Sequence, residues 1–534
     1  MHGLIRFRLA LGLAASLIFS FHTAHANDSK NSVKSARYKC ASLLTNAIPL
    51  SWVKKMAEEG KAHDPQVKRL RDNVQRNGFE NTALNADILK SHSDNYTLEL
   101  FQGPITDQQR SGRCWIFAGL NMIRSQMIAE GKVPENFEFS ENYLHFFNML
   151  EKSNRYLEEI IEQTSVNSVA KKLKIPGETR GEGLSSIFEP QISDGGWYEY
   201  FMFLVSKYGL MPKEAMPETR SALNTDALLT ELKKYLASTA AEMLVAINEF
   251  ESKAPKRMGK KKKEEKLTEL LRPIKERGMQ GVWKVLATHL GDPPTRFDYR
   301  MTGKSERRGL IRVNPTQVVT TTPKIFARKF IQFNPDDYVP VTTYSQLDPG
   351  IVYEIPESAI GPSTSKNHPY NLRFLNVDIS RLEHLAVNAI EGGQAVWFAA
   401  DIGIDVFNTA GIMHPKLFER DSIYNLSETE RMASLPRPLR TYFGLASPNH
   451  AMLLTGLDRP DPKGPVVKFK NENSWGKQVG SQGIYHLYRE WFQEYVFQII
   501  VHKRFLTERE RKAWGSEAAE VPAEADLADG VRQD

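Results

Sequence analysis

The residues that could form a nucleophilic site lie in three short segments, far apart in a chain of 534 residues. Cys114 follows the polar turn "DQQRSGR" and precedes an apolar run that begins at Trp115. His450 lies in "SPNHAMLLTG" and Asn473 in "NENSWG". A cysteine attacks a carbonyl carbon as its thiolate, an imidazole can take the thiol proton, and a neutral amide can orient the imidazole without adding charge. These residue types predict acyl transfer through a thiol.

The turn before Cys114 also holds a candidate for the oxyanion hole. The side-chain N–H of Gln108 and the backbone N–H of Cys114 can both donate to a developing oxyanion. We expect Cys114 at a helix N-terminus, where the helix dipole favours a thiolate. The residues behind that expectation recur at helical spacing: Ile116, Leu120, Ile123 and Met127. Trp475 can cover the hydrogen bond between His450 and Asn473.

Taken alone, each of these residues has a structural interpretation that needs no catalysis. An isolated cysteine before an apolar run is more often structural, and an isolated histidine before a strand is usually a loop or core residue. His414 in "GIMHPKLF" competes as the base, but the proline after it indicates a loop and no amide partner lies in an equivalent position. The combination favours the catalytic interpretation with His450.

Three segments, in chain order, resemble the papain superfamily of cysteine peptidases, and its bleomycin hydrolase and aminopeptidase C branch most closely: "DQQRSGRCWIFAGLNMIR", "NHAMLLTG" and "NENSWG". Further similar segments are "DGGWYEYFMFLVSKYGLMPKEAMPET", "QAVWFAADIG" and "GIYHLYREWFQEYVFQIIV". The resemblance implies an α+β papain-like fold. In that fold a helical left domain packs on a β-barrel right domain with the cleft between them, and large helical insertions are added.

The resemblance also implies a role for each site residue. Cys114 would be the nucleophile that forms a thioester acyl-enzyme, and His450 would act as general base and then as general acid. Asn473 would orient His450, and Gln108 would line the oxyanion hole. The implied activity is hydrolysis of peptide bonds by an aminopeptidase of the bleomycin hydrolase type.

Substrate binding is predicted less directly. Gly195 and Gly196 match a glycine pair that lets the backbone of papain-like enzymes bind an extended peptide. We expect Trp475 to take part in substrate binding as well. In this branch the C-terminal arm usually lies in the cleft, where its carboxylate meets the substrate's amino group. The tail after residue 505 does not resemble that arm. An endopeptidase with altered end selection, or a non-catalytic binding protein on the same fold, therefore remain alternatives.

The first 26 residues have the pattern of a secretory signal peptide. A basic "MHGLIRFR" precedes the apolar "LALGLAASLIFSF", and "AHA" matches a cleavage site before Asn27. The apolar run is shorter than the roughly 20 residues that span a bilayer. We expect an exported protein, periplasmic or secreted. The second cysteine is Cys40, and a disulfide between it and Cys114 would abolish activity.

Composition and sequence pattern indicate which partners the protein binds and how the chain divides into segments. The net charge of +6 is small for this length and does not by itself argue for nucleic-acid binding. The run Lys260–Lys263 favours a solvated helix or loop over a polyanion site. We expect peptide substrates, a homo-oligomer (a hexameric ring by resemblance), no cofactor and no metal-ligand cluster. The expected segments are a signal peptide (1–26), an N-terminal helical extension (27–95), a helical left domain (96–220), a helical insertion (221–330), a β-rich right domain (331–505) and an acidic, disordered tail (506–534).

Overall fold

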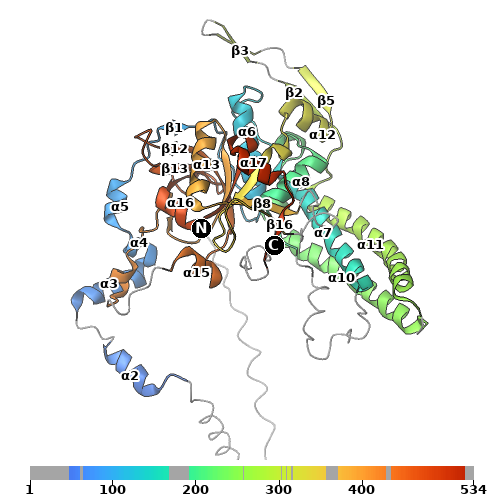
Figure 1. Ribbon diagram of the computed structural model, residues 1–534, viewed down its shortest axis with the longest axis horizontal. Coiled ribbons are helices and arrows are strands. Elements are labelled where there is room, and N and C mark those ends of the chain that lie inside the picture. The colour runs from blue at the N-terminus through green and yellow to red at the C-terminus, as the bar shows by residue number, and fades with distance from the viewer. Residues whose placement is uncertain are drawn as a thin grey trace, which may run out of the picture. The chain divides into compact units, whose positions relative to one another are not determined.

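The computed structural model forms two compact units, residues 1–82 and 83–534. It describes residues 47–59, 64–166, 190, 192–255, 258–301, 304–307, 310–313, 317–355, 371–427 and 435–522. The expected signal peptide and Cys40 lie outside the described residues. Both units are drawn in Figure 1.

The described part of the first unit is helical and mostly exposed. Its helices are α2 (Leu50–Glu59) and α3 (Pro65–Asn77), and α4 (Phe79–Ala83) begins in this unit. Asp64 caps α3 by accepting a hydrogen bond from the backbone N–H of Gln66 at 2.7 Å. Few of its apolar residues are buried, so capping and local propensity define this extension more than a packed core does.

Long helices make up the first half of the second unit, and their apolar side chains share one core. The central helix, α6, is buried almost all round, as expected for a helix that is apolar on every face. Gly119 of α6 allows Phe201 to approach closely, because an added Cβ would lie 2.8 Å from the phenyl ring. Figure 1 shows α7, α10 and α11 side by side. The helices are α5 (Ala86–Ser91), α6 (Cys114–Ala129), α7 (Glu141–Val166), α8 (Tyr198–Tyr208), η2 (Lys213–Ala215), α9 (Arg220–Leu223), α10 (Asp226–Lys253) and α11 (Lys260–Leu290).

The segment expected to be a helical insertion, 221–330, is helical as far as Leu290 and then changes. Two short hairpins follow, β2 (Phe297–Met301) with β5 (Gln317–Thr321) and β3 (Lys304–Arg307) with β4 (Leu310–Val313). Valine and threonine dominate β5, and such β-branched residues favour strands. The chain returns to helix at α12 (Pro323–Ile325) and η3 (Phe326–Ile331). The segment predicted as a helical insertion therefore also contains strands, between residues 297 and 321.

The last third is built on a sheet. Among the described residues, twelve strands join it in the order β10-β11-β14-β13-β12-β9-β15-β6-β8-β7-β16, with β1 paired to β12. Helices and sheet together confirm the expected α+β class. The strands are β1 (Leu98–Glu99), β6 (Tyr338–Thr342), β7 (Val352–Ile355), β8 (Leu372–Asn376), β9 (Val396–Ala400), β10 (Val406–Phe407), β11 (Ile412–Met413), β12 (His450–Asp458), β13 (Lys468–Glu472), β14 (Ile484–Tyr488), β15 (Val496–His502) and β16 (Ala519–Glu520).

The middle strands of this sheet separate two cores. On β9, Trp397 and Ala399 belong to the helical core, whereas Val396, Phe398 and Ala400 belong to a second core. Side chains of a strand alternate between faces, so one strand serves both layers. The second core also includes α13 (Ile379–Glu391) and α16 (Arg489–Tyr495). The shorter elements near the sheet are η4 (Pro335–Asp337), α14 (Arg420–Tyr424), α15 (Arg437–Tyr442) and η5 (Lys503–Phe505).

The C-terminal segment is ordered further than its composition predicted. Residues after 505 form α17 (Glu508–Trp514), which begins with a capping box between Thr507 and Glu510. Arg381 of α13 donates two hydrogen bonds to Glu510, both 2.8 Å long. β16 then pairs with β7. The prediction of disorder from 506 is wrong for 506–522, because specific capping and ion pairing fix an acidic segment; 523–534 lie outside the described residues.

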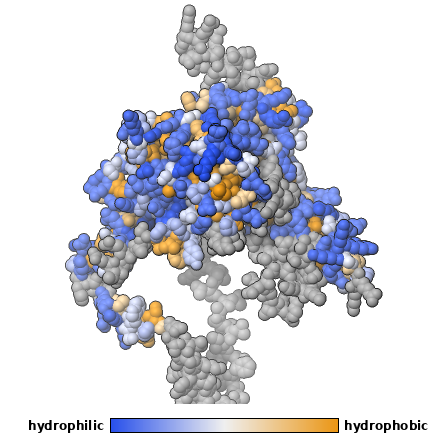
Figure 2. Space-filling view, in the orientation of Figure 1, coloured by the Kyte–Doolittle hydropathy of each residue, from blue (hydrophilic) through white to orange (hydrophobic). Residues whose placement is uncertain are grey.

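The surface is consistent with the composition. The face shown in Figure 2 is mostly hydrophilic, with small separate apolar patches. Within the described ranges, no helix combines the length and the apolar character needed to cross a membrane. The lysine run Lys260–Lys263 opens α11, and Lys263 pairs with Glu251 at 2.5 Å. This is the solvated helix favoured from the sequence.

Candidate active site

Cys114 is the first residue of α6, as the helical spacing predicts. Arg113 is the N-cap residue, and its side chain makes no capping hydrogen bond to the helix. The N-terminal end of α6 presents partial positive charge around the sulfur. Cys114 is partly exposed, whereas Trp115 is fully buried. This setting favours the thiolate form of Cys114.

A buried arginine fixes the start of α6. Arg113 has no exposed surface, and its guanidinium donates to the hydroxyl of Ser111 at 3.0 Å, to the carboxylate of Glu218 at 3.0 Å and to the carbonyl of Ala222 at 2.6 Å. Three directions of hydrogen bonding leave the backbone before Cys114 little freedom. Sequence reasoning did not single out Arg113, because its partners are distant in the chain.

The predicted glycine pair lies beside the start of α6. Asp194 accepts a hydrogen bond from the N–H of Gly112 at 2.8 Å, and its carbonyl accepts one from Nε1 of Trp115 at 2.9 Å. A Cβ on Gly196 would lie 2.7 Å from the Trp115 ring, and one on Gly112 would lie 3.3 Å from the backbone nitrogen of Gly195. Small residues are therefore required here by close packing. The structure brings Gly195 and Gly196 next to the cysteine's helix.

Gln108 is buried and held at both ends of its amide. Its Oε1 accepts a hydrogen bond from Oγ of Ser474 at 2.6 Å, and its Nε2 donates to the carbonyl of Ser111 at 2.6 Å. Its backbone N–H donates to the carbonyl of Ser474 at 2.8 Å. A primary amide carries two N–H bonds, so one donor remains for a further acceptor. Ser474, which the sequence analysis passed over within "NSW", fixes the orientation of this amide.

His450 and Asn473 form the predicted pair. His450 is buried at the start of β12, and its Nε2 lies 2.9 Å from Oδ1 of Asn473. The same Oδ1 accepts the N–H of Ser474 at 2.8 Å. The ring of Trp475 lies 4.8 Å from the His450 ring, centroid to centroid. With Nε2 engaged, Nδ1 is the nitrogen of His450 left to exchange a proton.

Burial controls the charge of this imidazole. It lowers the pKa of His450 to about 4, and the hydrogen bond with Asn473 opposes that shift by a smaller amount. Neutral at pH 7, the imidazole is able to accept a proton from a neighbouring thiol. A thiolate formed beside it would in turn stabilise the imidazolium.

Hydrogen bonds bring the start of α6 to the strands that carry His450. Nε1 of Trp397, on β9, donates to the carbonyl of Trp115 at 3.2 Å. Three residues further along β9, Ala400 pairs with His450 of β12. The residue after Cys114 and the strand end that holds His450 are therefore fixed to the same strand.

A buried ion pair makes a second connection. Arg124 of α6 lies 3.2 Å from Oε1 of Glu472, and Asn121 donates to the same oxygen at 2.9 Å. Burial raises the pKa of Glu472 to about 6, although Arg124 opposes the shift. Glu472 directly precedes Asn473, so the nucleophile's helix and the amide that orients His450 are linked within one network.

His414, the competing base, lies elsewhere. Its Nδ1 accepts the N–H of Lys416 at 3.1 Å, and its ring lies 5.1 Å from that of Tyr488. Tyr488 pairs with Lys468 at one end of the β13–β14 ladder, and Asn473 follows the other end. The structure gives His414 no part in the hydrogen-bonded chain from Gln108 to His450.

Comparison with known proteins shows which family the chain belongs to. The model of the Peptidase C1-like family matches residues 48–527. Aminopeptidase C of Lactobacillus delbrueckii subsp. lactis is 28% identical over 455 residues, covering 84% of this chain and 90% of that protein. Aminopeptidase C of Lactococcus lactis subsp. cremoris is 29% identical over 463 residues, covering 85% and 93%.

Solved structures show the same relationship. The crystal structure of PepW from Lactobacillus rhamnosis matches with a TM-score of 0.72 and 25% identity, covering 90% of this chain and 99% of that one. The α+β architecture described above is thus papain-like. The chain belongs to the Peptidase C1-like family and is a cysteine-type peptidase of the bleomycin hydrolase and aminopeptidase C branch.

Proposed function

We propose that this protein is an aminopeptidase that hydrolyses peptide bonds with Cys114, His450 and Asn473. The observation that carries the proposal is the hydrogen-bonded chain from Gln108 through Ser474 and Asn473 to His450, at strands joined to the start of α6. Each member supplies a group that acyl transfer to a thiol requires.

The first half of the reaction forms a thioester. Nδ1 of His450 takes the proton from Sγ of Cys114, and the thiolate attacks the carbonyl carbon of the peptide bond. The oxyanion receives hydrogen bonds from the remaining N–H of Gln108 and from the backbone N–H of Cys114. The imidazolium then gives its proton to the leaving nitrogen, the C–N bond breaks, and the amine product departs.

The second half reverses these roles. His450 removes a proton from water, and the resulting hydroxide attacks the thioester carbon. The C–S bond breaks, the carboxylic acid product leaves, and the proton on His450 returns to the thiolate of Cys114. Asn473 accepts from Nε2–H throughout and holds the ring without adding a charge that would fix the proton.

Removal of residues one at a time from the free amino end is proposed from the relatives, which are named aminopeptidases C and E. The test compares a fluorogenic amino-acid amide with its N-acetylated form. We expect hydrolysis of the free amine alone, and the Cys114→Ala variant should be inactive. Preference for acetylated or internal bonds would support an endopeptidase, and equal turnover by Cys114→Ala would leave the non-catalytic binding protein.

The C-terminal segment is the part of the chain to truncate in this test. Val521 packs against a small cluster that includes Tyr344 and Phe497. Phe497 follows Val496, which pairs with Ala400, the residue opposite His450. The described end of the tail therefore packs on a cluster that includes a residue of β15, the strand next to β9. A chain ending at Pro522 that keeps activity but accepts acetylated substrates would assign end selection to residues 523–534.

We also propose that the protein is exported and that residues 1–26 are removed. The support is the sequence pattern of a basic start, a short apolar run and "AHA". N-terminal sequencing of protein recovered from the host should give Asn27 as the first residue. Ring assembly, expected from the family resemblance, is measured on the same sample by light scattering, and a monomer mass would contradict it.

A further inference from the structure

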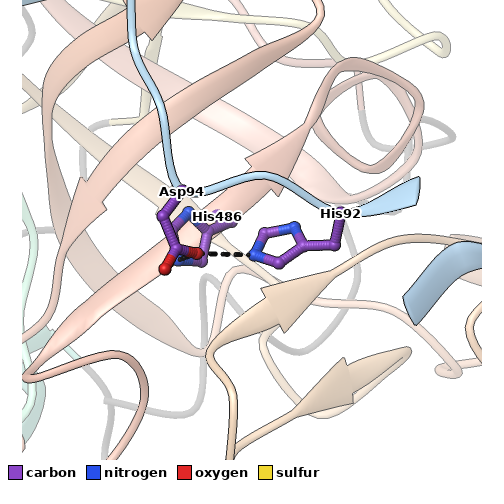
Figure 3. A group of neighbouring side chains, drawn as sticks. All are labelled: His92, Asp94 and His486. Carbon is purple, nitrogen blue, oxygen red and sulfur yellow. Dashed lines mark hydrogen bonds and ion pairs between the residues drawn. The ribbon is translucent and has the colours of Figure 1, made fainter. Parts of the chain in front are cut away.

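Two histidines and one carboxylate converge on one face of β14, where His486 pairs with Lys470 in the middle of the β13–β14 ladder. His92 and Asp94 lie between α5 and β1, and His486 lies on β14. Figure 3 shows side chains from these two segments meeting at Asp94. His92 Nε2 is 2.9 Å from Asp94 Oδ1, and His486 Nε2 is 3.2 Å from the same oxygen. One ligand atom from each of the three residues lies within 4.8 Å of the others.

The two imidazoles are oriented by tyrosine hydroxyls. Nδ1 of His92 lies 3.0 Å from the hydroxyl of Tyr488, and Nδ1 of His486 lies 2.7 Å from that of Tyr96. A hydrogen bond at one ring nitrogen fixes the tautomer and turns the other nitrogen toward a metal ion in known sites. When both Nδ1–H groups donate to the tyrosines, two Nε2 lone pairs and a carboxylate oxygen point at one place. That arrangement requires a cation.

His486 supplies the second, independent observation. It is 2% exposed, and its Nε2 has no hydrogen-bond partner of acceptable geometry, although it faces Asp94. A buried polar atom without a hydrogen bond is uncommon and calls for a ligand. Nearby positive charge is already neutralised, because Lys468 pairs with Asp458 at 2.8 Å and Lys470 pairs with Glu99.

We propose that His92, Asp94 and His486 bind one divalent transition-metal ion of the zinc class. Zinc–nitrogen and zinc–oxygen bonds of about 2.0–2.2 Å place neighbouring ligand atoms of a tetrahedral site roughly 3.3–3.5 Å apart. The separations of Asp94 Oδ1 from the two Nε2 atoms, 2.9 and 3.2 Å, are within about half an ångström of this spacing. The Asp94 side chain is 73% exposed, so a water molecule can complete the coordination from the solvent side.

The ion would act as a clamp between distant parts of the chain. Leu487 and Tyr485 of β14 point into the sheet core, so His486 lies on the opposite face. The segment around Asp94 covers that face through ring contacts of His92 and Tyr96 with His486, and it leads into β1 and on to Gln108. A metal bond across about 390 residues of sequence would fix this segment to β14. The site does not depend on the proposed peptidase mechanism.

This cluster is not predicted by the sequence, since no segment contains a recognisable ligand spacing. His92 and Asp94 form a His-x-Asp pair, which is weak alone. The third ligand comes from a strand near the other end of the chain and is brought close by the fold.

Zinc binding is tested on tag-free protein carrying Cys114→Ala, because the thiolate would itself bind zinc. After removal of metal with a chelator, isothermal titration with Zn²⁺ should give one ion per chain. Asp94→Asn and His92→Gln should each weaken binding by at least about 10–100-fold. His384→Gln, an exposed histidine on α13, is the matched control and should bind zinc as the parent does.

Three further readouts separate a metal site from a hydrogen-bond cluster. Co²⁺ should give a visible absorption band that Asp94→Asn removes. Zinc should raise the Tm of the parent and not that of Asp94→Asn, whose exposed side chain leaves folding intact. Tyr96→Phe should weaken zinc binding by about 10-fold. Absence of zinc binding by the folded parent, or equal binding by Asp94→Asn and His92→Gln, would overturn the proposal.

Discussion

Two histidine sites on the same sheet differ in the charge of their partners. In the first, His450 meets the neutral amide of Asn473 and an aromatic ring, and burial lowers its pKa to about 4. In the second, His92 and His486 share the carboxylate of Asp94. A neutral partner orients an imidazole and leaves its proton mobile, whereas a carboxylate favours a bound cation. We therefore propose that the same residue type serves proton transfer in one place and cation binding in the other.

The largest expected effect comes from removing the imidazole that transfers the proton. His450→Gln should lower kcat/KM for a fluorogenic amino-acid amide by about 10⁴-fold, because the thiol loses its base and the leaving nitrogen its acid. Steady-state kinetics on folded protein, checked by circular dichroism, measures this. His384→Gln should keep parental activity. A comparable loss in His414→Gln would instead make the competing histidine the base.

The next effect separates oxyanion stabilisation from nucleophile formation. Gln108→Ala removes one of two donors to the oxyanion and should lower kcat by about 10²–10³-fold. Alkylation of Cys114 by iodoacetamide should continue at a similar rate, since His450 and Asn473 still form the thiolate. Equal losses in hydrolysis and alkylation would mean that Gln108 supports the structure of the site and not the oxyanion.

A third experiment places a carboxylate beside His450, as Asp94 lies beside His92 and His486. Asn473→Asp places a carboxylate beside Nε2 and should raise the pKa of His450 by about one to three units. A protonated imidazole cannot take the thiol proton, so the acid limb of the kcat/KM profile should move to higher pH by a similar amount. Asn473→Ala is the control, because it removes the orienting oxygen without adding charge. An unmoved acid limb in Asn473→Asp would contradict the expected effect of a charged partner.

The local parts of this site could be predicted from the sequence. Helical spacing after Cys114 gave the correct helix start, and the segments around His450 and Asn473 led to residues that the structure joins at 2.9 Å. These predictions succeed because each rests on a few neighbouring residues. The α+β class was implied by the family resemblance, and a helical first half with a strand-rich last third agrees with it.

The parts that depend on distant partners could not be predicted. Arg113 looks like any arginine in a polar turn until Glu218 and Ala222 surround it. Ser474 gains a role when Gln108 lies against it. The tail was judged by its acidic composition, but Arg381 holds Glu510 and fixes α17. Residue spacing along the chain does not predict such contacts, because they form only when folding brings distant segments together.

Two glutamates extend the contrast between neutral and charged partners, and neither could be recognised from the sequence. Glu199 of α8 is buried against Gln498, whose amide donates at 3.4 Å, and burial raises the pKa of Glu199 to about 8. Burial would also raise the pKa of Glu510, but Arg381 and the backbone of Thr507 outweigh it and lower that pKa to about 2. The smallest predicted effect concerns how stability changes with pH at these two sites.

Folded protein keeps Glu199 protonated where the unfolded chain, with a carboxyl pKa near 4.5, has lost the proton. Stability from this group therefore falls as pH rises from about 4.5 to about 8. Glu199→Gln removes this pH dependence of stability. The Tm of the variant minus the Tm of the parent should therefore increase by about 2 °C or more between pH 5 and pH 9. Glu510 has the opposite sign: its contribution is present above pH 4.5 and is lost as pH falls toward 2, so Glu510→Gln should lower Tm at pH 7 and not at pH 2. Parallel pH curves for Glu199→Gln and the parent, measured by scanning calorimetry, would show that the amide of Gln498 compensates buried charge as well as a cation does.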